Sequence, residues 1–508
     1  MNPSDSTASL STLEAKLVPY HVPILLALGF LIRVWLIHHH PIIFGGDSIV
    51  RLVNRDKILL SHQLPTLQAA IHYLGFLSLD PLPVRYFMAV AGSIAGWGFY
   101  LMAGALLGRS AAFAAALFFV AHPFLLAYSI VPYQEIVMLA GLFFAFYFFF
   151  AERWLLASVA LGMACLTRYE AWTAVPVFVV AFAFQRPNFM RRSAEAILLF
   201  GWAPLAWLLY NAGLAPEGSY VLDFAPPLDR FFRYVYLSWI TVKFTPIPVL
   251  LLAAIGVWRF FSRGLLRSRR YLMLIAFLAL FLIAILFSGH GDQNPPDRFV
   301  SAREAHILDA AVLFLAGLGL SRLSRYRVPT VAACLLWGIF AADRFVAAET
   351  SEPKTRLSYD VARYLDDNVR NGERAIVLVK PVSADMLDDY LDAATRRGGT
   401  AGRRKALEIL AGIDVSPPDF QRTLVHSRLA PEQLVSLASP LLAADDQASF
   451  RDLAGSPPAD AGSPDWIVVW SDFQPSSRAE VQIQQQVAAE QPVGVLRSGN
   501  YSASIYSK

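Results

Sequence analysis

Long apolar segments, separated by short polar ones, fill the first 348 residues of the chain. A membrane-spanning helix needs about 20 mostly apolar residues, and eleven segments approach that length, at residues 19–37, 85–108, 111–130, 134–151, 154–167, 171–185, 194–213, 235–257, 271–288, 304–320 and 328–346. The fifth and sixth are short and meet at LTRYEAW. The pattern predicts a polytopic α-helical membrane domain, residues 1–348, with about 11 transmembrane helices.

Basic residues in the loops indicate which side each loop faces. Three loops are rich in arginine, QRPNFMRR, WRFFSRGLLRSRR and SRLSRYR. Lys and Arg are retained on the cytoplasmic side, and all three loops fall on one side if the N-terminus is cytoplasmic. An odd number of spans then places the C-terminus outside. The loops 38–84, 131–133, 168–170, 214–234 and 289–303 are expected on that outer side.

The character of the chain changes over residues 349–508. Long apolar runs end, and helical patterns such as YDVARYLDDNV alternate with short β-like runs such as AIVLV and DWIVVW. Strands alternating with helices predict an extracytoplasmic α/β domain. The segment LAGSPPADAGSPD within it has the composition of a loop.

Composition supports a membrane protein and excludes other classes. Hydrophobic residues make up 56% and charged residues 16%, whereas soluble proteins carry about 25% charged residues. A net charge of +4 does not suggest a nucleic-acid partner. Cys165 and Cys334 lie in apolar segments, so no disulfide framework is expected. The first residues, MNPSDSTASLSTLEAK, do not have the pattern of a cleaved signal peptide.

The first outer loop carries an unusual polar stretch, FGGDSIVRLVNR. A helix over residues 47–60 would place Asp47, Arg51, Asn54 and Arg55 on one stripe and apolar residues on the other. The glycines at 45–46 would allow a sharp turn, and Asp47 would begin a helix whose N-terminal dipole favours a carboxylate. Two interpretations follow: an interfacial helix with a surface ion pair, or one wall of a pocket.

Three further outer segments carry ionisable groups, which are costly at membrane depth and tend to face a cavity or a partner. In VPYQEIV, Glu135 opens a span after a proline, and in LTRYEAW, Arg168 and Glu170 interrupt an apolar hairpin. Helix-start chemistry and a local ion pair are the structural interpretations of these groups. The loop before the tenth span contains Arg298 and Arg303. The adjacent histidines 38–40 lack metal-ligand spacing and are interpreted as marking the interface, and His290 with Asp292 is a weak candidate for a divalent ion.

Carboxylates and arginines in these positions fit sugar transfer from a lipid phosphate, the reaction implied by a family resemblance that the same motifs carry. Inverting sugar transfer needs a base to take the acceptor hydroxyl proton, and a carboxylate is suited to this. A lipid-phosphate leaving group needs positive charge where negative charge collects, and guanidinium groups match phosphate oxygens. We therefore expect donor phosphate to be bound without a metal or other cofactor. The candidate cations are Arg51, Arg55, Arg168, Arg298 and Arg303.

The order of these motifs resembles the GT-C superfamily of membrane glycosyltransferases, in particular the bacterial protein-mannosyltransferase-like branch that includes lipid A aminoarabinose transferases. The stretches FGGDSIVRL, HPFLLAYSIVPYQE and GMACLTRYEAW carry the resemblance, which covers about residues 19–330. It implies a polyprenyl-phosphate-linked sugar donor and a glycan, lipid or protein acceptor. It also implies catalytic roles for Asp47, as general base, and Glu135. Tyr133, Gln134, Tyr169 and Glu170 are expected to bind substrate.

The expected protein is thus a polyprenyl-phosphate-sugar-dependent hexosyl- or pentosyltransferase. High Ala and Arg usage suggests a GC-rich bacterial gene, and hence an inner membrane with a periplasmic active site. Two alternatives remain open. A lipid-linked sugar transporter or flippase would have broken helices and midplane charges in both halves, and Lys243 is the main mid-span charge. A non-catalytic membrane scaffold would use its outer domain to bind a partner.

Overall fold

The structure is a computed structural model of the 508-residue chain. It describes the chain in the following ranges: 18–59, 64–75, 78, 80–185, 189–214, 227–287, 305–321, 327–370, 372–379, 391, 400, 403–404, 407, 417–429, 433–436, 464–473, 478–488 and 490–507. The predicted loop LAGSPPADAGSPD lies almost entirely outside these residues.

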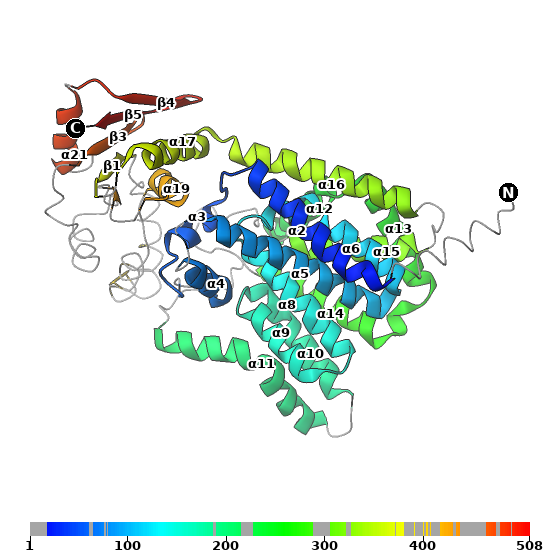
Figure 1. Ribbon diagram of the computed structural model, residues 1–508. Helices are drawn as coiled ribbons and strands as arrows, with labels where there is room; N and C mark the ends of the chain where they lie inside the picture. Colours follow the sequence, from blue (N-terminus) through cyan, green and yellow to red (C-terminus); the bar gives the residue numbers. More distant parts are fainter. Residues whose placement is uncertain are drawn as a thin grey trace, which may run out of the picture.

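A bundle of α-helices forms most of the described structure (Figure 1). The helices of this bundle and of its loops are η1 (Val18–Tyr20), α2 (His21–His39), α3 (Gly46–Val53), α4 (Pro65–Gly75), α5 (Leu82–Leu107), α6 (Arg109–Val120), α7 (Pro123–Tyr128), α8 (Gln134–Phe150), α9 (Trp154–Cys165), η2 (Tyr169–Thr173), α10 (Ala174–Ala183), α11 (Phe189–Leu214), α12 (Pro227–Phe244), α13 (Ile247–Ser262), η3 (Leu265–Arg267), α14 (Arg269–Phe287), α15 (His306–Leu320) and α16 (Arg327–Thr350).

Four described helices are long and apolar enough to cross a membrane, or up to five if the bent pair α12–α13 counts as one span. Five shorter apolar helices, among them α8 and α15, lie with them. The prediction of a multi-pass helical membrane protein is confirmed at this level, while the number eleven stays a prediction.

Two of the predicted spans are broken, and a proline explains each break. The segment 111–130 divides into α6 and α7 at His122, which is extended (φ −63°, ψ 124°) because the following Pro123 disfavours helical geometry. The segment 235–257 divides into α12 and α13, which meet at 120° around Thr245 and Pro246. The second break lies next to α7, since His122 Nε2 is 3.2 Å from Thr245 Oγ1.

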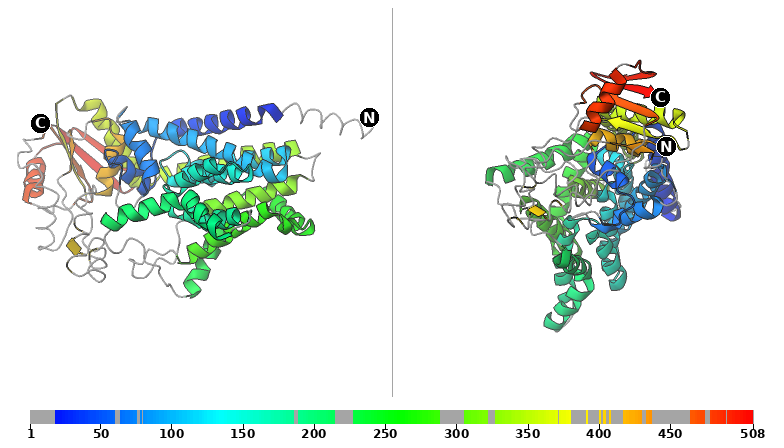
Figure 2. Two further views of the ribbon diagram at one scale, coloured as in Figure 1. Left: turned by 90° about the horizontal axis from the view of Figure 1, so that it is seen from below. Right: turned by 90° about the vertical axis from the view of Figure 1, so that its left-hand side faces the viewer.

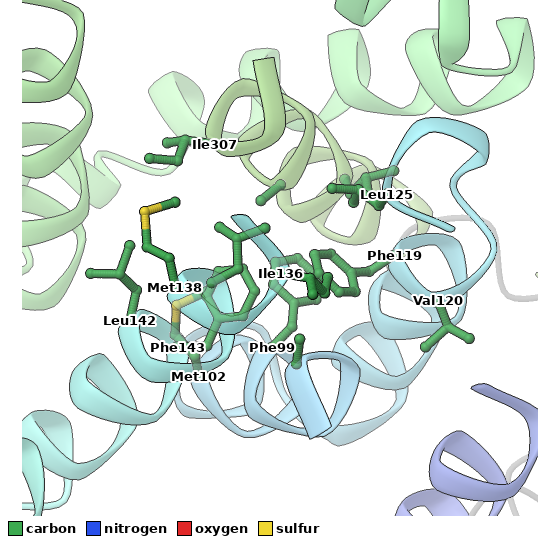
Figure 3. Packing of buried hydrophobic residues seen from close by; sticks show 14 of the residues in the cluster. Phe99, Met102, Phe119, Val120, Leu125, Ile136, Met138, Leu142, Phe143 and Ile307 are labelled. Carbon is green, nitrogen blue, oxygen red and sulfur yellow. The ribbon is translucent and has the colours of Figure 1, made fainter. Parts of the chain in front are cut away.

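Small residues bring the helices of the bundle into close contact. A Cβ on Gly256 of α13 would lie 2.0 Å from the Leu315 carbonyl oxygen, and one on Gly319 of α15 would lie 2.0 Å from that of Leu252. Such contacts between backbones are typical of helices packed in a membrane. Around them, Phe99 of α5 and Phe143 of α8 belong to a large buried apolar cluster (Figure 3).

The C-terminal part of the chain contains a small sheet with helices beside it, called here the sheet unit, while its being an extracytoplasmic domain stays a prediction. Its strands are β1 (Ala375–Leu378), β2 (Leu434–Val435), β3 (Trp466–Trp470), β4 (Gly494–Ser498) and β5 (Tyr501–Ser507), and its main described helices are α17 (Pro353–Asn368), α19 (Pro418–His426) and α21 (Arg478–Ala488). The strand order is β2-β1-β3-β5-β4. β1 pairs in parallel with β2 and β3, and β5 pairs antiparallel with β3 and β4. The proposed boundary at residues 348 and 349 falls near the end of α16 and stays a prediction.

The sheet unit lies at one end of the helical bundle, which we call the domain end (Figures 1 and 2). α2 runs toward this end, and α3 and α4 lie there beside the sheet unit (Figure 1). The Ile43 N–H donates a hydrogen bond to Nε2 of His426 in α19, at 2.8 Å. Arg428 lies 3.7 Å from the Asp80 carboxylate. The sheet unit therefore rests on the segments around α3 and the start of α5.

Candidate functional site

Asp47 lies in the first turn of α3, as the double glycine predicts. Gly45 precedes the helix with φ +85°, a conformation that favours glycine. A Cβ at Gly45 would lie only 2.0 Å from the Tyr133 hydroxyl. The Tyr133 ring, itself buried, thus packs directly on the turn that leads into α3. This contact joins the segment carrying Asp47 to the segment carrying Glu135.

The helix α3 is shorter than predicted and its polar stripe is largely buried. It ends at Val53 instead of continuing to residue 60. The Gln68 side-chain amide of α4 donates to the carbonyl oxygens of Asn54 and Lys57, at 2.8 and 3.1 Å. These two backbone carbonyl groups beyond the end of α3 thus receive hydrogen bonds. Arg51 is 2% exposed. The interpretation of α3 as an interfacial helix with a surface ion pair is therefore wrong, because Arg51, one member of that pair, is buried.

Glu135, Arg168 and Glu170 form one cluster of charges. Arg168 Nη1 lies 2.5 Å from Oε1 of Glu135, and its Nε lies 3.0 Å from each carboxylate oxygen of Glu170. Glu135 is 2% exposed and sits in the first turn of α8. The predicted local pair between Arg168 and Glu170 is thus present. The structure adds Glu135, which lies 33 positions earlier in the chain.

The remaining predicted substrate residues surround this cluster. The Gln134 amide donates to the Leu64 carbonyl at 3.3 Å. The Tyr169 hydroxyl accepts a hydrogen bond from the Trp207 indole at 2.9 Å. Around them, the Thr66 N–H donates to the Leu166 carbonyl oxygen at 3.1 Å, which ties α4 to the end of α9. The three sequence motifs therefore converge at the domain end.

Two predicted phosphate ligands lie outside the described residues. They are Arg298 and Arg303, and the loop histidine and aspartate at 290 and 292 lie outside as well. Arg55, by contrast, is half-buried just beyond α3. Burial lowers its pKa, and the neighbouring Asp56 opposes that shift.

Arg85 is a buried cation at this end that the sequence interpretation passed over. Its side chain is 2% exposed. It donates to the carbonyl oxygens of Ile130, Pro41 and His40, at 3.0, 3.0 and 2.8 Å. Arg85 thereby holds the start of the first loop against the segment before α8. Its signal in the sequence was an arginine at the start of an apolar span.

A second group of polar side chains is buried among the helices near α7. It includes His122, His306 and Asp309, each no more than 2% exposed. Their aromatic neighbours include Phe124, whose ring centroid lies 5.0 Å from that of His306. The lone Asp within the apolar stretch 306–320 was the sequence signal for this group.

An apolar cavity of about 380 Å³ lies within the helical bundle. Helices α5, α8, α13, α14 and α15 line it, with side chains that include Phe99, Leu139, Phe260 and Ile307. Leu139 lies one turn along α8 from Glu135, a rise of about 6 Å. From Leu139 the lining continues to Phe261, Leu266 and Tyr271, at the end of the bundle that carries the loop between α13 and α14.

Two solved structures have a fold similar to that of nearly the whole chain. The crystal structure of ArnT from Cupriavidus metallidurans bound to undecaprenyl phosphate matches with a TM-score of 0.60, at 11% sequence identity. The match covers 95% of this chain and 97% of that chain. The apo form of the same protein matches with a TM-score of 0.59, 12% identity and the same coverage.

The chain thus has the fold of the GT-C membrane glycosyltransferases, which confirms the predicted resemblance. Within it, residues 65–213 match the model of the dolichyl-phosphate-mannose-protein mannosyltransferase family. That region contains Glu135, Arg168 and Glu170. No curated protein sequence matches the chain.

Proposed function

We propose that this protein is an integral membrane glycosyltransferase that moves a sugar from a polyprenyl-phosphate-linked donor to an extracytoplasmic acceptor. The carrying observation is the cluster of Glu135, Arg168 and Glu170 at the domain end of a GT-C-like helical bundle. The interior of the same bundle holds the apolar cavity. The cavity suits a hydrocarbon chain, and the arginines at the domain end suit its phosphate. The domain end would face the periplasm of a bacterial inner membrane.

Asp47 is the proposed general base. It lies at the start of α3, half-buried, two residues after the turn that packs on Tyr133. It would take the acceptor hydroxyl proton as the oxygen attacks the anomeric carbon with inversion. The departing lipid phosphate needs no proton, because the arginines stabilise its charge. Arg51, Arg55, Arg298 and Arg303 are the proposed phosphate ligands beside Arg168.

Glu135 is the second proposed catalytic residue, and it also has a proposed positioning role through Arg168. The Arg168 guanidinium contacts two carboxylates, which hold it in one orientation. A phosphate arriving near Arg168 would meet a cation already positioned, so little side-chain entropy would be lost on binding. Tyr133, Gln134, Tyr169 and Glu170 would contact the sugar or the acceptor.

A binding and transfer experiment tests the proposal. Purified protein in nanodiscs receives a short-chain polyprenyl phosphate, or the matching polyprenol as a control without the phosphate. We expect thermal stabilisation by the phosphate alone. Asp47→Asn should retain this binding and lose sugar transfer by about 10²- to 10⁴-fold, the usual contribution of a general base. The exposed neighbour Asp56 supplies the matched control, Asp56→Asn, with transfer unchanged.

The outcomes separate the alternatives. Equal stabilisation by the phosphate and the polyprenol would contradict a phosphate site. Movement of lipid-linked sugar across proteoliposomes that persists in Asp47→Asn, without any transfer, would favour a flippase. No response to either lipid in any variant would favour a scaffold that binds a partner through its sheet unit.

A further inference from the structure

Two adjacent histidines and one aspartate bring three ligand atoms together at the domain end. His39 is the last residue of α2, His40 follows it, and Asp343 belongs to α16. Nε2 of His40 lies 2.7 Å, and Nε2 of His39 3.5 Å, from the same Asp343 oxygen. All three ligand atoms lie within 4.8 Å of one another, the one such group of His, Cys, Asp and Glu in the described part of the chain.

Neighbouring histidines on one helix point in different directions, so their convergence has a structural cause. His40 has left the helix, with φ −123° and ψ 84°. Its N–H donates to Leu36 at 2.9 Å, and its carbonyl oxygen accepts from buried Arg85 at 2.8 Å. The His39 ring stacks on Trp35, with centroids 5.3 Å apart and planes 10° apart. Backbone and ring contacts therefore orient both imidazoles.

The third ligand is held by the packing of α16. A Cβ at Gly338 of α16 would lie 2.0 Å from the Ala121 carbonyl oxygen, so this helix lies directly against the end of α6. Ala342 and Val346, on either side of Asp343 in the sequence, are fully buried. Asp343 itself has a side chain 22% exposed. The carboxylate therefore projects from a fixed helix while remaining accessible to an ion.

The spacing of His39 and Asp343 is close to that of two ligands of one metal ion, whereas the 2.7 Å contact of His40 is a hydrogen bond that metal binding would replace. A hydrogen bond accounts for His40 and Asp343, but 3.5 Å is too long for one between His39 and the same oxygen. Two ligand atoms bound to one tetrahedral zinc ion, each at about 2.0–2.1 Å, lie about 3.3 Å apart. Imidazole nitrogen with carboxylate oxygen is a donor set for zinc and neighbouring divalent transition metals.

We propose that His39, His40 and Asp343 bind a divalent transition-metal ion of the zinc class, with water at the remaining position. The ion would tie the end of α2 to α16, and α16 leads within three residues into α17 of the sheet unit. It would also hold the start of the loop that carries Asp47. The site uses none of the proposed sugar-transfer residues, so metal binding can be tested whether or not transfer occurs.

The experiment uses tag-free, chelator-treated protein in nanodiscs, because an affinity tag of histidines would itself bind metal. Zinc is titrated while thermal stability and metal content are measured, and cobalt is added separately to record its visible spectrum. We expect one zinc ion per chain, a rise in Tm and a tetrahedral cobalt spectrum. Asp343→Asn, which preserves side-chain shape, and His40→Ala should each weaken binding by more than about 100-fold, since even residues around a metal site contribute about 10- to 100-fold.

The neighbouring His38 is the matched control. Its Nε2 lies 2.8 Å from the Tyr86 hydroxyl, away from the proposed site, so His38→Ala should bind zinc like the wild type. Metal-free Asp343→Asn should unfold near the temperature of metal-free wild type, which shows that the variant is folded. Wild type without stoichiometric zinc, or Asp343→Asn with undiminished zinc, would overturn the proposal.

Discussion

The Arg168 guanidinium reaches across 33 residues to lie 2.5 Å from the buried Glu135 carboxylate. Its other side contacts Glu170. At the domain end of the bundle, one cation is therefore held between two carboxylates. This arrangement of charges is in place before any substrate binds. Removing the cation should therefore affect stability as well as any sugar transfer.

We expect Arg168→Leu to lower the free energy of unfolding by about 3–5 kcal/mol, because it leaves buried Glu135 without its cation. Arg168→Lys should lie between wild type and Arg168→Leu, since an ammonium cannot match the two-oxygen contact with Glu170. Thermal and denaturant unfolding in detergent measure both. Arg191, 82% exposed and paired with Glu195, supplies the control, because Arg191→Leu should cost at most about 1 kcal/mol. Equal effects of the two leucine variants would contradict the prediction.

Gly45→Ala should destabilise the turn before Asp47. The new methyl group would collide with the Tyr133 hydroxyl, and alanine would have to adopt φ +85° and ψ 127°. A backbone conformation of this rare kind costs about 1–3 kcal/mol before any collision. Gly46 is the matched control, since nothing lies within 4 Å of a Cβ there. Gly46→Ala should unfold at nearly the wild-type temperature. If both alanine variants behave alike in thermal unfolding, the close approach of Tyr133 is not a constraint.

Arg85→Met should loosen the first loop. The change leaves three carbonyl oxygens, of His40, Pro41 and Ile130, without their donor. Each buried group left unsatisfied costs about 1–3 kcal/mol. We expect a fall of at least about 3 kcal/mol in the free energy of unfolding, with faster proteolysis of the loop. Arg109→Met, at an exposed helix start, should leave both unchanged.

The contact between the sheet unit and the bundle should weaken in acid. Burial and, to a smaller extent, the nearby Arg85 and Arg422 charges lower the pKa of His426 to about 4, while its hydrogen bond to the Arg422 carbonyl opposes this change. The neutral ring fits its partners, with Nδ1–H donating to the Arg422 carbonyl and Nε2 accepting from Ile43. Because the unfolded ring has a pKa near 6.5, the unfolded state binds more protons between about pH 4 and 6.5, and stability falls as pH decreases through that window.

The size of the acid effect follows from that shift in pKa. About 2.5 pKa units correspond to about 3 kcal/mol, present in full above about pH 6.5 and lost by about pH 4. His426→Gln should remove most of this dependence when Tm is measured from pH 4 to 7. A wild-type profile no steeper than that of His426→Gln would show that the ring is not held neutral.

The amino-acid sequence by itself determined the membrane class, the GT-C resemblance and the alternation of strands and helices after residue 349. These properties are local, because the composition of a short stretch and the periodicity of its apolar residues dictate whether it forms a buried helix or a strand. It also located Asp47 at a helix start after Gly45 and Gly46. The breaks at His122 and Thr245 were encoded too, in the prolines that follow them.

Only the tertiary structure decided which distant groups meet. Arg168 forms ion pairs with Glu135 as well as with its neighbour Glu170, because the packing of α8 beside α9 brings Glu135 close to Arg168. His39 and His40 converge on Asp343, 303 residues after His40, because Arg85 holds His40 outside its helix. Such pairings depend on the loops and on helix packing, which no single stretch of sequence encodes. The groups of charged side chains at the domain end are therefore assembled by tertiary contacts.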